Sequence, residues 1–122
     1  MKVVIMGCGR VGARIASILD HNGHDVSVID KESRAFRRLA PDFRGQTIIG
    51  TGIDEDVLRS AGIEQAQVFI AVTNGDNRNI MAAQVARHVF NVPEVICRIY
   101  DPVREDTYRR LGLTTVCPTT TI

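Results

Sequence analysis

The stretch Gly7-Cys8-Gly9-Arg10-Val11-Gly12 decides how this chain folds. It fits the pattern G-x-G-x-x-G, follows the apolar run Val3-Val4-Ile5-Met6, and runs directly into a helical pattern. A strand, this turn and a helix present free backbone N–H groups and a positive helix end to a phosphate. The first glycine permits the tight turn, the second lets the backbone approach a pyrophosphate, and the third lets helix and strand pack closely. We therefore expect all six residues to form the phosphate-binding part of a nucleotide site.

An acidic residue follows at the spacing that this fingerprint requires. Asp30 lies eighteen residues after Gly12, at the end of the apolar run Val26-Ser27-Val28-Ile29. A carboxylate there accepts hydrogen bonds from ribose hydroxyls and repels a 2′-phosphate. This favours NAD(H), or ATP or ADP, over NADP. The alternative for Asp30 is a cap on the following helix, which is compatible with ribose binding.

Composition indicates one globular domain over residues 1–122. Apolar residues make up 44% of the chain, and the formal net charge is +1, so nothing points to a nucleic-acid partner. Arg34, Arg37 and Arg38 are interpreted as a solvated helix face.

Compartment signals indicate a cytoplasmic protein. No apolar run approaches the ~20 residues that span a bilayer, and the N-terminus enters a strand without a signal-peptide pattern. The cysteines Cys8, Cys97 and Cys117 are odd in number and widely spaced, as expected of reduced cytosolic thiols. A redox role for Cys8 is the weaker reading.

Apolar strands alternate with helical segments along the whole chain. The predicted strands are Lys2–Met6, Asp25–Ile29, Thr47–Ile49, Gln67–Val72, Val95–Ile99 and Thr115–Cys117. The predicted helices are Arg10–Asn22, Lys31–Leu39, Asp54–Gly62, Asp76–Phe90 and Val103–Leu111, with Asp54 and Asp76 as N-caps. The pattern predicts an α/β, Rossmann-like doubly wound fold: a parallel six-stranded sheet in the order 3-2-1-4-5-6, with helices on both faces.

Ligands of such sheets bind outside the carboxyl ends of the strands. Lys31 joins Asp30 after the second strand, and Thr51 and Gly52 follow the third, where they could read an adenine edge or simply form a loop. Thr73 and Asn74 follow the fourth strand and could line the ribose or phosphates. Arg98 interrupts an apolar strand, which favours a phosphate or carboxylate partner.

Two further features are open to two interpretations. Arg10 opposes the dipole at a helix start, which a bound phosphate would reverse, so we expect it either to sense the number of phosphates or to face solvent. The helix Asp76–Phe90 is apolar around much of its circumference, which indicates a second subunit or an alanine-rich helix that tolerates water. The three histidines pair with no nucleophile or metal ligand, and no catalytic or metal site is predicted.

With these motifs in place, the chain resembles the RCK N-terminal domain family, also called TrkA-N or KTN, of prokaryotic potassium channels and transporters. The stretches that carry the resemblance cover nearly the whole chain: residues 3–12, Val28-Ile29-Asp30, Gly50-Thr51-Gly52, residues 58–63, residues 71–79, and Arg98 with Tyr100-Asp101-Pro102. One departure is Thr51, where the family commonly has Asp. A second is that the C-terminal ligand-binding domain usual in the family is absent from this chain.

The resemblance implies a cytosolic regulatory subunit rather than an enzyme. It implies NAD(H), ATP or ADP in the crevice, with Gly7 to Gly12 on the phosphates, Asp30 on the ribose, and Thr73, Asn74 and Arg98 lining the rest. It also implies homodimers that assemble toward a ring, peripheral to the inner face of the membrane, where they gate a potassium-translocating subunit. The alternative is the NAD-binding domain of a dehydrogenase, which needs an acid/base residue that this sequence does not supply.

Overall fold

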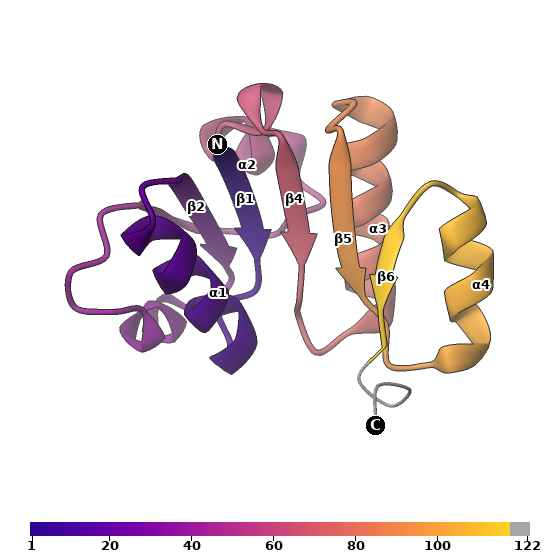
Figure 1. The fold of residues 1–122 in the computed structure, drawn as a ribbon, viewed down its shortest axis with the longest axis horizontal. Helices are drawn as coiled ribbons and strands as arrows, with labels where there is room; N and C mark the ends of the chain where they lie inside the picture. The colour runs from indigo at the N-terminus through magenta and orange to yellow at the C-terminus, as the bar shows by residue number, and fades with distance from the viewer. Residues whose placement is uncertain (118–122) are drawn as a thin grey trace.

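A computed structural model describes residues 1–117, so the last five residues of the predicted 1–122 domain lie outside the described part. Strands and helices alternate along it (Figure 1). The strands are β1 (Lys2–Met6), β2 (Asp25–Asp30), β3 (Gln46–Ile49), β4 (Val68–Ala71), β5 (Glu94–Arg98) and β6 (Thr114–Val116). The helices are α1 (Arg10–His21), η1 (Ser33–Arg38), α2 (Glu55–Ser60), η2 (Ile63–Gln65), α3 (Asp76–Gln84), η3 (Val85–Val89) and α4 (Pro102–Arg110).

All six strands are parallel and run in the order β3-β2-β1-β4-β5-β6, as the sequence predicts. The chain moves outward from β1 to β3, returns across β1, and continues outward from β4 to β6. The carboxyl ends of β1 and β4 therefore lie side by side at the point where the direction reverses, which is where such sheets bind ligands.

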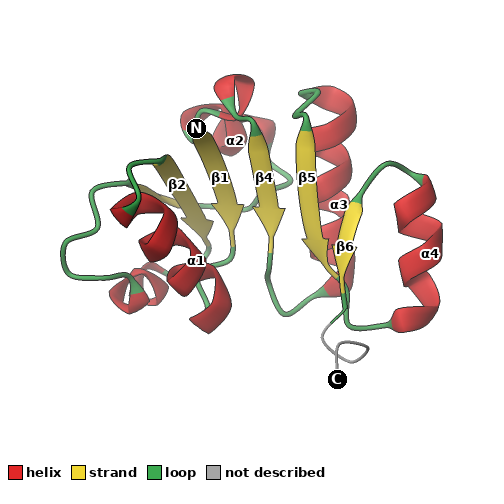
Figure 2. Ribbon diagram, viewed as in Figure 1, coloured by secondary structure: helices red, strands yellow, loops and turns green. Residues whose placement is uncertain are grey.

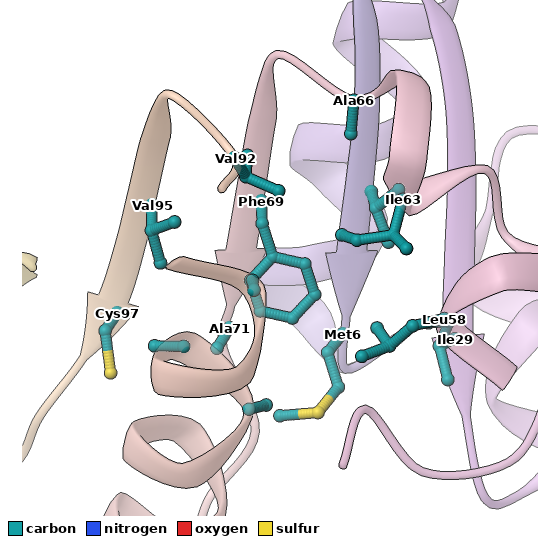
Figure 3. Close-up of a cluster of buried hydrophobic side chains, with 14 of the residues drawn as sticks. Met6, Ile29, Leu58, Ile63, Ala66, Phe69, Ala71, Val92, Val95 and Cys97 are labelled. Carbon is teal, nitrogen blue, oxygen red and sulfur yellow. The ribbon is translucent and has the colours of Figure 1, made fainter. Parts of the chain in front are cut away.

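Alternating side chains of the strands build two cores, one on each face of the sheet. On β1, Val3 and Ile5 join the core that includes residues of α1 and η1, whereas Val4 and Met6 join the core that includes residues of α2 and α3. Figure 2 shows α1 on one face of the sheet and α2 and α3 on the other. Phe69 of β4 is fully buried in the second core, and Figure 3 shows its ring between Val95 and Ile63. Helices cover both faces, as predicted.

The second predicted helix is wrong in type. Residues 33–38 form a short 3-10 helix rather than an α-helix over Lys31–Leu39. The Asp30 carboxylate binds the Glu32 N–H at 2.9 Å and holds the entry to this segment, while Leu39 returns to extended backbone just before Ala40-Pro41. Because both ends of the segment are fixed, only six residues remain between them, and 3-10 turns are common in such short connecting segments.

The fourth predicted helix is interrupted. Asp76–Phe90 is α-helical only to Gln84, and a π-helix follows over Val85–Val89. The Phe90 N–H bonds to the Val85 carbonyl at 3.3 Å, five residues back. The wider turn ends the helix at Asn91, which adopts a left-handed φ of 54°. Within the described residues, none of the helices has the length and apolar character needed to cross a membrane.

Candidate functional site

A cavity of about 770 Å³ opens at the carboxyl ends of the strands, lined by the turns after β1, β2, β3 and β4 and by the end of β5. It brings together most of the predicted site residues: Gly7, Cys8, Gly9, Asp30, Lys31, Thr51, Gly52, Thr73, Asn74 and Arg98. Arg10, Val11 and Gly12 do not line it; they form the first turn of α1 behind the glycine loop.

The three glycines of the turn have three different geometries. Gly7 has a φ of +107°, and a Cβ there would lie 3.0 Å from the backbone of Val72. A Cβ on Gly12 would overlap the Gly7 carbonyl oxygen and approach a Val72 methyl group at 3.2 Å. Gly9 faces open space, with no atom within 4 Å of a Cβ placed there. The first and third glycines thus allow the packing, and the second leaves room for a ligand.

Asp30 braces the glycine turn. Its Oδ2 accepts a hydrogen bond from the Cys8 N–H at 2.8 Å, and its Oδ1 accepts one from the Glu32 N–H at 2.9 Å. A carboxylate oxygen has two lone pairs, so each oxygen retains one that can accept from a ribose hydroxyl. Glu32, not Asp30, is the N-cap of η1, so Asp30 holds the approach to this helix without capping it. Ribose binding by Asp30 stays a prediction.

Cys8 is fully buried inside the turn. Burial, aided by the negative charge of Asp30 and opposed by Arg38, raises the pKa of the Cys8 thiol to about 11. The thiol is therefore protonated at neutral pH and is a poor nucleophile.

Asn79 organises the turn after β4 and is the main residue that motif reasoning misses. Its side chain is fully buried. Its Oδ1 accepts from the Thr73 N–H at 2.9 Å and from Thr73 Oγ1 at 2.7 Å, while its Nδ2 donates to the carbonyls of Thr73 at 3.0 Å and Arg98 at 2.8 Å. The sequence gives little signal for this role, because Asn79 follows the polar residues 76–78 and directly precedes the apolar stretch that begins at Ile80. Thr73 Oγ1 is thus committed to the turn, and Asn74 is the exposed member of the pair.

Arg98 lines the cavity, but its guanidinium is already bound to backbone carbonyls. Its Nη2 donates to the carbonyls of Val72 at 2.8 Å and Thr73 at 3.0 Å, and its guanidinium lies 5.0 Å from the centre of the Tyr100 ring. Its Nε is buried without a hydrogen-bond partner among residues 1–117. The side chain therefore fixes the β4–α3 turn and places positive charge beneath it.

The prediction that Asp76 caps its own helix is wrong. Gly75 occupies the N-cap position of α3, and the Asp76 carboxylate accepts hydrogen bonds from the backbone N–H groups of Tyr100 at 2.7 Å and Asp101 at 3.0 Å. Arg104 Nη1 donates to Asn77 Oδ1 at 2.7 Å beside this contact. The start of α3 is therefore fastened to the start of α4.

The loop after β3 packs tightly below the cavity. A Cβ on Gly52 would overlap the Met6 sulfur, so only glycine lets this loop lie on the end of β1. Asp54 caps α2 as predicted, with Oδ1 accepting from Asp56 N–H at 2.9 Å and Val57 N–H at 3.4 Å. Thr51 remains exposed at the cavity.

The cavity is lined by an excess of cationic side chains, although the net charge of the whole chain is only +1. Its lining includes six cationic and two acidic side chains, namely Lys31, Arg34, Arg37, Arg38, Arg78 and Arg98 against Asp30 and Glu32. None of the six makes an ion pair, whereas Lys2, Arg59, Arg104 and Arg109 are all paired elsewhere within residues 1–117. Arg38 Nη1 reaches the Cys8 carbonyl at 3.5 Å. The arginines of η1 are exposed as expected, but they also face the site.

A match to a known family accounts for this geometry. The model of the TrkA-N domain matches residues 3–119. The chain belongs to the TrkA-N family. It is 54% identical over 116 residues to the Trk system potassium uptake protein TrkA of Streptomyces coelicolor, covering 95% of this chain and 52% of that protein. It is 35% identical over 113 residues to the TrkA homolog of Methanothermobacter thermautotrophicus, covering 93% and 52%.

Solved structures share the fold. The Kef C-terminal domain of Shewanella denitrificans in its AMP-bound form has a TM-score of 0.83 and 21% identity, covering 98% of this chain and 73% of that one. The GsuK channel bound to NAD has a TM-score of 0.78 and 20% identity, covering 96% and 21%. GsuK bound to ADP has the same TM-score and 19% identity, covering 95% and 31%. These structures share the fold with this chain, which spans about half the length of the curated relatives it matches.

Proposed function

We propose that this TrkA-N domain is a non-catalytic nucleotide sensor that regulates potassium uptake. Its ligand is NAD(H) or ATP/ADP, bound in the cavity at the strand ends. The observation that carries the proposal is the open space at Gly9, in a cavity that is also lined by the Asp30 carboxylate and by six cationic side chains without an ion pair in residues 1–117. A ribose on Asp30 would lead its phosphates directly across that glycine.

Support for this ligand class comes from relatives of the same fold, whose structures contain AMP, NAD or ADP. The site residues Gly7 to Gly12, Asp30, Lys31, Thr51, Gly52, Thr73, Asn74 and Arg98 are proposed as the binding set. Arg10, Val11 and Gly12 would act through the first turn of α1, whose N-terminus faces the phosphates.

Regulation is proposed to run through a cytoplasmic homodimer that assembles toward a ring on a potassium-translocating membrane subunit. Most apolar side chains of α3 and η3 are buried by this chain itself, but Met81 and Val89 are each about half exposed and are candidates for the subunit contact. Regulation requires that nucleotides differ in affinity for two states of that assembly.

The alternative, a dehydrogenase cofactor domain, has less support. Among the residues that line the cavity there is no histidine, and the Cys8 thiol is held protonated by its raised pKa. A hydride-transfer site needs an acid/base group facing the nicotinamide.

Calorimetric titration with NADH, NAD, ATP and ADP tests the proposal. We expect at least one of them to bind in the micromolar range. If none binds more tightly than about millimolar, the sensor function is wrong. Hydride transfer from bound NADH to a substrate would instead support the dehydrogenase.

A further inference from the structure

The cavity has an end that neither Asp30 nor the glycine turn occupies. The strand order places the end of β1 between the ends of β2 and β4. Neighbouring strands lie ~4.8 Å apart, so a linear nucleotide with its ribose at Asp30 crosses the glycine turn and then reaches the turn after β4. Thr73 and Asn74 line the cavity there, followed by Arg78 in the first turn of α3.

Arg78 lies over this far end. Its guanidinium folds back on Gly75, and a Cβ placed on that glycine would come within 2.8 Å of Arg78 Nε and 3.1 Å of Nη2. This position puts its charge at the cavity wall instead of out along the helix.

The charge of Arg78 is uncompensated within residues 1–117, where the side chain makes no ion pair or hydrogen bond. The acid closest to it in sequence, Asp76, directs both carboxylate oxygens to the backbone of Tyr100 and Asp101. Arg98, the other cation at this end, is fixed to the carbonyls of Val72 and Thr73. Arg78 is therefore the cation at this end that remains available to a ligand.

We propose that Arg78 binds the terminal phosphate of a nucleoside triphosphate and makes the cavity prefer such a ligand over NAD(H). The inference rests on the proposed nucleotide site and specifies its ligand. In a triphosphate, anionic groups continue past the glycine turn to the end of β4. In NAD(H), the same place receives the nicotinamide half, which offers no phosphate to an unpaired guanidinium. A guanidinium holds a phosphate by charge-assisted hydrogen bonds, which give both affinity and discrimination.

The test compares ATP, ADP, AMP and NADH by calorimetry on the wild-type chain and on R78A, R78K and R110A. Arg110 is exposed at the end of α4 and does not line the cavity, so R110A removes the same charge at a distance. We expect R78A to weaken ATP about 10- to 100-fold, which corresponds to the loss of one charged hydrogen-bonding partner. AMP and NADH should change less than about twofold, R78K should recover part of the ATP affinity, and R110A should match the wild type.

Each other outcome overturns the proposal in a distinguishable way. Equal losses for ATP and AMP in R78A would show that Arg78 supports the fold of the turn and not a terminal phosphate. Unchanged ATP affinity in R78A, or wild-type binding of NADH tighter than ATP, would contradict the assignment while leaving the sensor function intact. A wild-type chain that binds none of the four nucleotides would overturn the proposed function itself.

Discussion

Replacing single glycines of the turn should separate packing from ligand binding. In Gly12→Ala, the new methyl group would overlap the Gly7 carbonyl oxygen and press on a Val72 methyl group at 3.2 Å. Both neighbours belong to the closely packed junction of β1, β4 and α1, so relief requires the helix to move off the sheet. Overpacking of this kind costs about 3 kcal/mol. For a domain of this size that corresponds to a fall in Tm of about 10 °C.

The matched control is Gly9→Ala, only three residues away. Gly9 has an extended backbone with φ of −78° and ψ of −163°, and its Cβ would meet no atom within 4 Å. Its stability should stay within about 1 kcal/mol of the wild type, because alanine is a weaker N-cap but also reduces the entropy of the unfolded chain. Its nucleotide affinity should fall about tenfold or more, because the methyl group occupies the space that a phosphate would enter.

Urea and thermal unfolding followed by circular dichroism measure the first effect, and calorimetric titration measures the second. A Gly12→Ala chain with a Tm within about 2 °C of the wild type would refute the packing argument. A Gly9→Ala chain that binds nucleotide as tightly as the wild type would refute the assignment of the open space.

Three other predictions concern residues around the cavity. Asn79→Leu should lower the free energy of unfolding by about 3 kcal/mol in urea titrations, because loss of the buried amide leaves backbone groups of Thr73 and Arg98 without hydrogen-bond partners. A loss below about 1 kcal/mol would contradict this role. Asp76→Ala should speed hydrogen exchange at the amides of Tyr100 and Asp101 while leaving β1 protected, and unchanged exchange would show that the α3–α4 contact is not needed. The pKa of Cys8 is raised to about 11, so above pH ~9 the unfolded state loses its thiol proton first and stability should fall as pH rises toward 11. The free energy of unfolding, measured between these two pH values, should fall less in Cys8→Ala than in the wild type. An identical fall in the two chains would argue against the raised pKa of Cys8.

The fold could be predicted because its signals are local. Alternation of β-branched strands with helical segments, ended by residues such as Gly23 at a φ of +89°, fixes a parallel sheet and its order. The positions of Asp30 and of the glycine turn could likewise be predicted, because the fingerprint places both at the carboxyl ends of neighbouring strands.

The rest depends on contacts between segments distant in sequence. Nothing local shows that Asp76 binds backbone 24 and 25 residues later rather than capping its helix. Helical spacing indicates that Arg34 and Arg37 share a face, but not that the face borders the cavity. The sequence leaves Arg10 open between a phosphate ligand and a solvent-facing residue, and the structure places it outside the cavity lining while Arg78 lies within it.

The proposed function requires a nucleotide to bind at the carboxyl ends of the strands. Chemical-shift mapping of the ¹⁵N-labelled chain with ATP and with NADH tests it most directly. We expect the largest amide shifts at Gly7, Gly9, Asp30, Thr51 and Asn74, and a shift at Arg78 that is larger with ATP than with NADH. Saturating nucleotide that leaves these amides unmoved, or that moves only residues of α4 and the opposite edge of the sheet, would contradict it.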